Sequence, residues 1–121
     1  TKVLGKPRKV AIREASISRA LENLLLNAKR YGKKVELVIQ FDVSEIRITV
    51  HDNGHGIPAD KREQAILPFV RLELARTQSK GGGVGLGLAI AADVAKSHGG
   101  LLILSDSEEL GGLSAEIVLP F

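Results

Sequence analysis

Three short segments of this 121-residue chain carry groups suited to holding a nucleotide. Residues 81–88 read GGGVGLGL and run into an apolar helical pattern. A glycine-rich loop that opens a helix presents free backbone N–H groups and the positive end of the helix dipole, which together bind anions such as phosphate. Upstream lie two further segments whose polar side chains can complete such a site, NLLLNAKRYG (23–32) and HDNGHGIP (51–58).

In the first upstream segment, Asn23 and Asn27 lie four residues apart in an apolar helical pattern, so they share one face of the helix. An amide oxygen is a competent ligand for Mg²⁺, which takes few protein ligands and several phosphate oxygens or waters. The alternative interpretation is a pair of helix-surface amides.

In the second upstream segment, Asp52 ends a strand pattern and precedes Gly54 and Gly56, which let the backbone turn sharply and approach a ligand. Its carboxylate can accept a hydrogen bond from an exocyclic amine. The alternative is an Asx-turn, which Asp-Asn-Gly sequences commonly form.

The glycine segment differs from two better-known phosphate loops. It lacks the dinucleotide spacing G-x-G-x-x-G and the Lys-Ser/Thr that ends a P-loop. Its glycines alternate with aliphatic residues, so we expect the aliphatic side chains to anchor the loop in the core while the glycines face phosphates.

These segments must be positioned by the elements around them, whose order is strand, helix, hairpin, loop, helix, hairpin. We expect strands at 9–12, 35–43, 45–51, 101–104 and 113–119, and a loop at 70–82. We expect long helices from about 17 to 31 and at 84–97, the first of them capped by Ser16 or Ser18. A short helix at 60–67 would be stopped by Pro68. This order predicts a two-layer α/β sandwich, a mixed and mainly antiparallel sheet covered on one face by helices.

Composition narrows the class of protein. The length suits one domain, and 44% hydrophobic residues with few aromatics predict an aliphatic core. The absence of cysteine excludes disulfides and thiolate metal sites. Residues 1–34 carry ten Lys and Arg against two Glu, yet no aromatics are interleaved among the lysines, which argues against nucleic-acid binding. No signal peptide or membrane-spanning run is visible, and residue 1 is Thr, so we expect residues 1–121 to be a domain cut from a longer protein.

Together and in this order, the segments resemble the ATP-binding domain of sensor histidine kinases, in the superfamily shared with gyrase, Hsp90 and MutL. NLLLNAKRYG is similar to the N box, DNGHGI to the G1 box and GVGLGL to the G2 box. AILPFVR stands where the F box belongs, and GGLSAEIVLP resembles the closing glycine-turn strand. NAKRYG, PFVR, LART and GGLS look particularly like the subgroup of the osmosensor EnvZ. The resemblance covers nearly the whole chain and implies the Bergerat-type ATP-binding fold.

The resemblance implies a role for each matching residue. Asn27 would ligate Mg²⁺, and Asn23 would lie near the phosphates. Arg30 and Tyr31 would contact phosphate or ribose, and Asn23 and Arg30 are the candidate catalytic residues. Asp52 would accept a hydrogen bond from the adenine amino group.

The glycines and aliphatic residues of the boxes have implied roles as well. Gly56 would allow close approach of the ligand, and Gly83, Gly85 and Gly87 would form the hinge and the phosphate-facing backbone of a lid over 70–83. Leu86 and Leu88 would pack beneath this lid. The remaining box members also count as nucleotide-binding residues: Gly54, Ile57 and Val84.

Some positions depart from the family pattern. Ile66 replaces the usual F-box Phe, which bears on catalytic competence, and Val84 stands where Thr or Ser is frequent. Leu113 and Ala115 replace the usual Thr and Phe of the closing motif.

One position distinguishes a kinase from an ATPase in this superfamily. The water-activating ATPases of the superfamily carry Glu four residues before the metal-binding Asn, where this chain has Asn23, so no base is placed to orient an attacking water. This difference favours a kinase.

None of the three histidines, His51, His55 and His98, lies in the helical setting of a phosphoacceptor, so we expect structural or incidental roles for them.

The sequence therefore predicts the catalytic domain of a bacterial two-component sensor kinase. The full protein would transfer the γ-phosphoryl group of Mg·ATP to a histidine of a separate dimerisation domain and signal to a response regulator. We expect a monomeric, cytoplasmic domain whose parent is a homodimer in the inner membrane. Two alternatives remain, a free-standing anti-sigma-type serine kinase and a non-catalytic nucleotide-sensing module.

Overall fold

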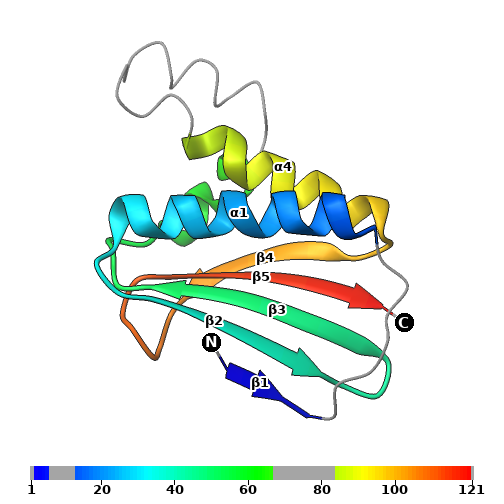
Figure 1. Cartoon of the computed structure of the whole chain (residues 1–121). Coiled ribbons are helices and arrows are strands. Elements are labelled where there is room, and N and C mark those ends of the chain that lie inside the picture. Colours follow the sequence, from blue (N-terminus) through cyan, green and yellow to red (C-terminus); the bar gives the residue numbers. More distant parts are fainter. Residues whose placement is uncertain (1, 6–12, 67–83, 121) are drawn as a thin grey trace.

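The computed structural model describes residues 2–5, 13–66 and 84–120 of the chain. In this part, five strands form one sheet in the spatial order β1-β2-β3-β5-β4 (Figure 1). Their bounds are β1 Lys2–Leu4, β2 Val35–Phe41, β3 Glu45–Asp52, β4 Leu101–Asp106 and β5 Leu113–Pro120. Strands β1 and β2 pair in parallel, and the other neighbours are antiparallel.

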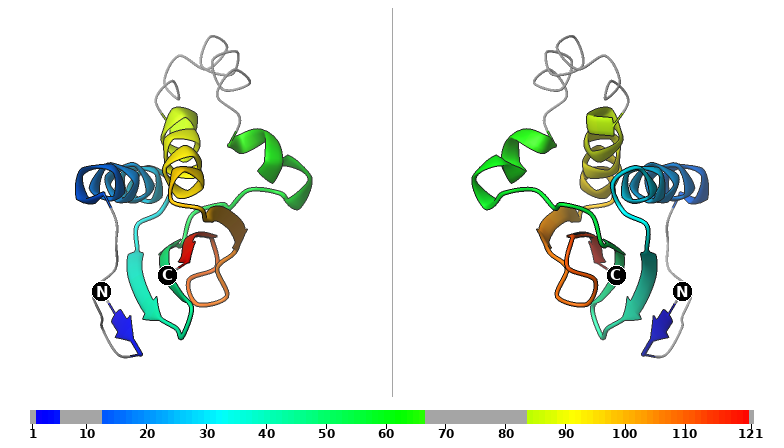
Figure 2. Two further views of the ribbon diagram at one scale, coloured as in Figure 1. Left: turned by 90° about the vertical axis from the view of Figure 1, so that its right-hand side faces the viewer. Right: turned by 90° about the vertical axis from the view of Figure 1, so that its left-hand side faces the viewer.

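Two long helices, α1 (Glu14–Tyr31) and α4 (Val84–Ser97), pack side by side on one face of this sheet (Figures 1 and 2). A 3₁₀ turn, η1 (Ala59–Lys61), runs into the short helix α2 (Arg62–Ala65), which lies on the side of α4 away from α1 (Figure 2). The predicted two-layer sandwich, a mainly antiparallel sheet covered on one face by helices, is confirmed.

The core lies between the two helices and the central strands, and it is aliphatic as the composition requires. Alternate residues of β3 and β5 face the helices because successive side chains of a strand point to opposite faces. The buried ones are Ile46, Ile48 and Val50 of β3 and Ala115, Ile117 and Leu119 of β5. On α1 the buried stripe follows helical spacing, with Ile17, Ala20, Leu24 and Ala28.

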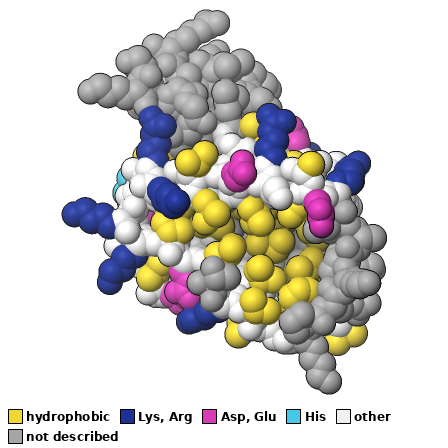
Figure 3. Space-filling model, viewed as in Figure 1, with side chains coloured by type: hydrophobic (Ala, Val, Ile, Leu, Met, Phe, Trp, Pro, Cys, Tyr) yellow, Lys and Arg dark blue, Asp and Glu magenta, His cyan; other side chains and the backbone are white. Residues whose placement is uncertain are grey.

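Where α1 does not fully cover the sheet, hydrophobic side chains reach the surface. Figure 3 shows them gathered between α1 and the edge formed by β1 and β2. The side chains of β2 that pack against the core here are half-buried: Val35, Leu37, Ile39 and Phe41. In the described ranges, neither long helix is apolar enough over a sufficient length to cross a bilayer.

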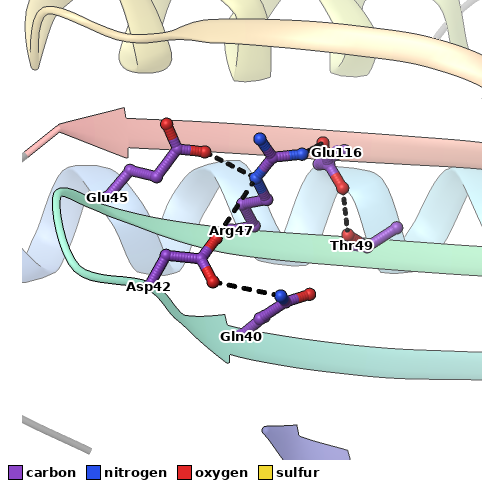
Figure 4. Close-up of polar contacts among 6 residues, drawn as sticks. All are labelled: Gln40, Asp42, Glu45, Arg47, Thr49 and Glu116. Carbon is purple, nitrogen blue, oxygen red and sulfur yellow. Dashed lines mark hydrogen bonds and ion pairs between the residues drawn. The ribbon is translucent and has the colours of Figure 1, made fainter. Parts of the chain in front are cut away.

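The face of the sheet away from the helices carries a network of charged and polar side chains (Figure 4). Arg47 forms ion pairs with Glu45, with Glu116 at 3.4 Å and with Asp42 at 3.5 Å, and Thr49 donates a hydrogen bond to Glu116 at 3.0 Å. The hydrogen bond to Glu45, helped by the surrounding carboxylates, raises the pKa of Arg47. The members of the network on β3 are Glu45, Arg47 and Thr49, which lie three or more residues along the strand from Asp52.

The element bounds differ from the sequence prediction in a few places. Strand β1 at Lys2–Leu4 was not expected, and the expected strand at 9–12 lies outside the described residues. Strand β2 ends at Phe41, two residues early, because the turn closes with a hydrogen bond from Asp42 N–H to Glu45 O. The helix expected at 60–67 is divided between η1 and α2, and its end near Pro68 lies outside the described residues, as does the loop at 70–82.

The start of α1 is also a correction. The helix begins at Glu14, and neither Ser16 nor Ser18 caps it. Instead the backbone N–H of Arg13 donates to His98 Nε2 at 3.1 Å, and the Arg13 guanidinium donates to the carbonyl and hydroxyl of Ser97. A cap supplied by the far end of α4 cannot be read from local sequence, and it gives His98 a structural role.

Candidate functional site

Asp52 ends β3 in a buried position, with 2% of its surface exposed. Its Oδ1 accepts hydrogen bonds from the backbone N–H groups of Gly54 at 2.9 Å and Leu113 at 3.1 Å. The N–H of Gly112 donates to the Asp52 carbonyl oxygen at 3.0 Å. Within the described residues no hydrogen bond to Oδ2 is found.

The turn between β4 and β5 forms a wall beside this carboxylate. A Cβ atom built on Gly112 would lie 2.5 Å from Asp52 O, 2.6 Å from Gly54 N and closer still to Asp52 Oδ1. Backbone and carboxylate cannot both shift away, so only glycine fits at this position without disturbing Asp52.

The end of α1 packs directly against the loop that follows Asp52. A Cβ on Gly54 would lie 2.7 Å from the carbonyl oxygen of Tyr31, so this glycine permits the contact. Asn53 Oδ1 accepts hydrogen bonds from Lys33 N–H at 2.7 Å and Lys34 N–H at 2.9 Å. The loop is thereby fixed to the turn between α1 and β2, which brings the two polar segments of the sequence together.

Tyr31 stands at this junction with 43% of its surface exposed. Its ring makes an edge-to-face contact with His55, with centroids 4.7 Å apart, and His55 Nδ1 donates to the carbonyl of Gly56 at 2.7 Å. Arg30 precedes Tyr31 in the last turn of α1 and is exposed. The two predicted contacts to phosphate or ribose therefore lie one residue apart beside the Asp52 loop.

One turn back along α1, Asn27 is 6% exposed and its Oδ1 has no hydrogen-bond partner in the described part of the chain. A buried polar atom without a partner costs about 1–3 kcal/mol, so such atoms are rare unless they serve a ligand or an ion. In the same ranges no three His, Asp or Glu side chains gather to hold a metal. An oxygen ligand contributed by Asn27 fits the preference of Mg²⁺ for few protein ligands.

Asn23 lies a further turn back and connects α1 to the start of α4. Its Nδ2 donates to the carbonyl of Arg19 at 2.9 Å, and its Oδ1 lies 3.5 Å from the place of a Cβ on Gly87. From Asn23 to Tyr31 the helix rises about 12 Å. The predicted polar residues thus form a row from Asp52 to the beginning of α4.

The glycine segment enters α4 at Val84, as predicted. Gly87 and Leu88 are buried, and Leu88 belongs to the core cluster. For Val84, Gly85 and Leu86 the structure describes the helical backbone alone, and Gly83 and the expected lid at 70–83 lie outside the described residues. The first N–H groups of a helix have no intrahelical partner, so the start of α4 offers such donors at the Asn23 end of the row.

Gly56 and Ile57 continue the loop after Asp52. Gly56 has φ +71°, a conformation that favours glycine, while a Cβ there would meet only Gly112 at 3.7 Å. Ile57 is half-buried against the core, and its carbonyl accepts a hydrogen bond from Arg62 Nε at 2.9 Å. Arg62 also pairs with Asp106 at 2.8 Å, so this side chain ties the loop to β4.

The structure therefore gathers the predicted residues of α1, of the β3 end and of the α4 start, and it adds residues that sequence reasoning missed. Asn53 was passed over although its Asn-Gly setting is a known turn signal. Arg62 and Gly112 act through long-range contacts that no local pattern records. Of the departures from the family pattern, Ile66, Leu113 and Ala115 all pack in or against the core.

Most of this chain is similar in sequence to known proteins. Residues 12–121 match the family described as histidine kinase-, DNA gyrase B- and HSP90-like ATPase. The sensor histidine kinase CpxA of Escherichia coli is 42% identical over 106 residues, which are 87% of this chain and 23% of that protein. The chain spans less than a quarter of the curated relatives that it matches.

Solved structures show the same fold. The NMR structure of the histidine kinase domain of the E. coli osmosensor EnvZ has 37% identity and a TM-score of 0.68, covering 98% of this chain and 73% of that one. The ATP-binding domain of PrrB from Mycobacterium tuberculosis has 28% identity and a TM-score of 0.72, covering 98% and 79%. The chain therefore belongs to the histidine kinase-, DNA gyrase B- and HSP90-like ATPase family, and its relatives within it are sensor histidine kinases.

Proposed function

We propose that residues 1–121 bind Mg·ATP and serve as the catalytic domain of a longer sensor histidine kinase. The observation that supports the metal and phosphate contacts is the buried Oδ1 of Asn27, which has no hydrogen-bond partner among the described residues. Asn27 lies in a row between the Asp52 carboxylate and the start of α4. Support for the longer protein comes from relatives that are four or more times the length of the matching region.

The residues fit a magnesium ion held between protein and phosphates. Bound Mg²⁺ would neutralise phosphate charge during transfer. Asn27 would supply an oxygen ligand, since its Oδ1 is buried and has no partner in the part of the chain that the structure describes. Asn23 would lie next to the phosphates, because a Cβ placed on Gly87 at the start of α4 would lie only 3.5 Å from its Oδ1.

Base selection would follow from the way Asp52 is held. Oδ1 is committed to two backbone N–H groups, which orients the carboxylate and leaves Oδ2 for the amino group of adenine. Guanine presents a carbonyl oxygen in place of that amine, so it would face a carboxylate without a donor. The site should therefore prefer ATP over GTP.

The chemistry expected of this row is transfer to an external nucleophile. The amide at position 23 cannot accept a proton as a carboxylate does, so the chain offers no evident base there to activate water. Catalysis would then consist of positioning the triphosphate by Asn23 and Arg30 and of stabilising its charge. In the longer protein the acceptor would be a histidine on a separate dimerisation domain, and the phosphoryl group would pass to a response regulator.

In the proposed arrangement, this chain is a cytoplasmic, monomeric domain, and its parent is a membrane-bound homodimer.

Calorimetry with ATP and GTP, with and without Mg²⁺, tests the nucleotide site directly. The substitution Asp52→Asn should weaken ATP binding by about tenfold or more, which corresponds to loss of a charge-assisted hydrogen bond. The same change at Asp93, which is exposed on α4, is a matched control that should leave the affinity unchanged.

Phosphoryl transfer is tested in the full-length parent with ATP labelled at the γ-phosphate. Label that is lost in acid but stable in alkali identifies phosphohistidine and supports the proposal. Acid-stable label on serine would favour the alternative of a serine kinase. ATP binding without any labelled product would favour a nucleotide-sensing module.

A further inference from the structure

The turn that holds Asp52 is itself built around a buried serine, Ser107, which is 2% exposed and follows β4. The N–H of Ser107 donates to the carbonyl of Gly112 at 2.7 Å, and its own carbonyl accepts from Gly111 N–H at 2.7 Å. Its Oγ accepts from Leu110 N–H at 3.1 Å. One residue therefore makes three of the hydrogen bonds that shape the segment from 107 to 112.

The hydroxyl of Ser107 makes a fourth hydrogen bond of this residue, with a partner on the strand that ends in Asp52. Ser107 Oγ and His51 Nδ1 are 2.9 Å apart, and either the hydroxyl or the ring N–H can donate in this pair. His51 is the residue before Asp52, and the two side chains leave β3 on opposite faces. The His51–Ser107 pair thus joins β3 to the turn on one side of the sheet, while Gly112 and Leu113 contact Asp52 on the other.

We propose that the His51–Ser107 pair is a positioning device that holds the Asp52 carboxylate ready for the adenine amino group. Ser107 fixes the turn, the turn aims the N–H groups of Gly112 and Leu113 at Asp52, and His51 locks the turn to the strand. This inference rests on the proposed role of Asp52 in base recognition. Neither His51 nor Ser107 needs to touch the nucleotide, so both act on it through Asp52.

The geometry makes this coupling tight. The Gly112 position tolerates no Cβ against Asp52, so a small displacement of the turn either crowds the carboxylate or removes its donors. A hydrogen bond of 3.1 Å from Leu113 N–H is already near the long end of the usual range, so a shift of a few tenths of an ångström would weaken it. Oδ1 would then be free to rotate, and Oδ2 would lose its fixed direction.

The test compares ATP with purine riboside triphosphate, which has hydrogen in place of the 6-amino group. Binding of both to this chain is measured by calorimetry with Mg²⁺, and the ratio of the two affinities reports the contact of Asp52 with the amino group. We expect Ser107→Ala to lower that ratio by about fivefold while the analogue binds almost unchanged, since one neutral hydrogen bond is lost. His51→Ala should lower it by about two- to threefold because the turn keeps its other bonds.

Ser114→Ala is the matched control. Ser114 is also a buried serine of this region and pairs with His51 across the strands, but its hydroxyl makes no hydrogen bond among the described residues. Its substitution should leave the ratio at the wild-type value. A general loss of stability in Ser107→Ala would lower both affinities together and leave the ratio unchanged, which would overturn the positioning role.

The outcomes separate this inference from the proposed function. Equal binding of ATP and the analogue by the wild-type chain would refute base recognition by Asp52. If the wild-type chain prefers ATP and Asp52→Asn removes the preference, an unchanged ratio in Ser107→Ala refutes the positioning device alone. Should Ser107→Ala fail to fold, His51→Ala decides: a reduced ratio supports the device and an unchanged ratio overturns it.

Discussion

If Asn27 is a metal ligand, removing its side chain should weaken the binding of Mg·ATP without lowering the free energy of unfolding. The substitution Asn27→Ala removes the carboxamide group, and with it a buried oxygen that has no partner among the described residues. A residue kept for structure would show the opposite behaviour. The two measured quantities are therefore the free energy of unfolding and the affinity for Mg·ATP.

The change in stability follows from three effects. Removing a buried unpaired carbonyl recovers about 1–3 kcal/mol of desolvation. Alanine is the better helix former by roughly 0.5 kcal/mol. A void of about a methyl group or more costs about 1 kcal/mol. The nucleotide-free variant should therefore be as stable as the wild type or up to about 2 kcal/mol more stable.

The change in affinity should be large. Loss of an outer-shell partner of a metal ligand typically weakens a site about 10–100-fold, so loss of the ligand itself should reach at least this range. The loss should appear with Mg²⁺ present and largely disappear when both proteins are compared without it. Asn27→Asp keeps an oxygen at this position and should keep part of the magnesium dependence.

Urea unfolding without nucleotide gives the stability, and calorimetry with ATP gives the affinity at two magnesium concentrations. Asn53→Ala is the matched control, since Asn53 Oδ1 accepts two backbone hydrogen bonds and its loss should destabilise the chain by about 1–3 kcal/mol. A destabilisation of Asn27→Ala as large as that of Asn53→Ala, or an unchanged affinity for Mg·ATP, would refute the reasoning.

Further substitutions probe the walls of the site. Gly112→Ala should abolish ATP binding in calorimetry because its Cβ would collide with Asp52. Gly111→Ala is the control, since a Cβ there would meet nothing within 4 Å although the backbone has φ +87°. It should lower the free energy of unfolding in urea by about 1 kcal/mol and leave the affinity for ATP unchanged. In Gly87→Ala the new Cβ would lie 3.5 Å from Asn23 of α1, so the substitution should raise the free energy of unfolding by about 0.5–1 kcal/mol. ATP binding in calorimetry should be weaker, because phosphates would approach this backbone. His98→Ala removes the acceptor that caps α1 and should lower the unfolding free energy by about 0.5–2 kcal/mol without changing ATP affinity.

Periodicity and the order of the elements predicted the layers of the fold, because hydrophobic side chains recur every two residues along β3 and β5 and every three or four along α1. The glycine segment before Val84 and Gly32 after Tyr31 predicted the start of α4 and the end of α1. The start of α1 was wrong for a physical reason: its cap comes from His98, more than eighty residues away. Local propensity holds no information about a partner that only the packing of two helices supplies.

The same limit applies to the site. The residues that would touch a nucleotide lie in short motifs, so their types and spacing indicated them. The groups that hold those residues, such as Ser107, Gly112 and Asn53, act through hydrogen bonds and close contacts between distant segments. A turn sequence rich in glycine predicts a turn, but it does not show that the turn rests against a carboxylate from another strand.

Asp52 shows why two interpretations that compete at the level of sequence can both hold in a structure. The Asx-turn was the alternative to a ligand contact, and the structure contains it, since Oδ1 accepts the N–H of Gly54. A carboxylate has two oxygens, however, and the turn uses only Oδ1. Fixing Oδ1 between Gly54 and Leu113 removes the rotational freedom that a ligand would otherwise have to restrict, so the turn prepares Oδ2 for recognition rather than competing with it. Asp52→Asn tests this argument, because the amide oxygen can keep the turn while the nitrogen replaces the acceptor, so stability should fall far less than affinity for ATP.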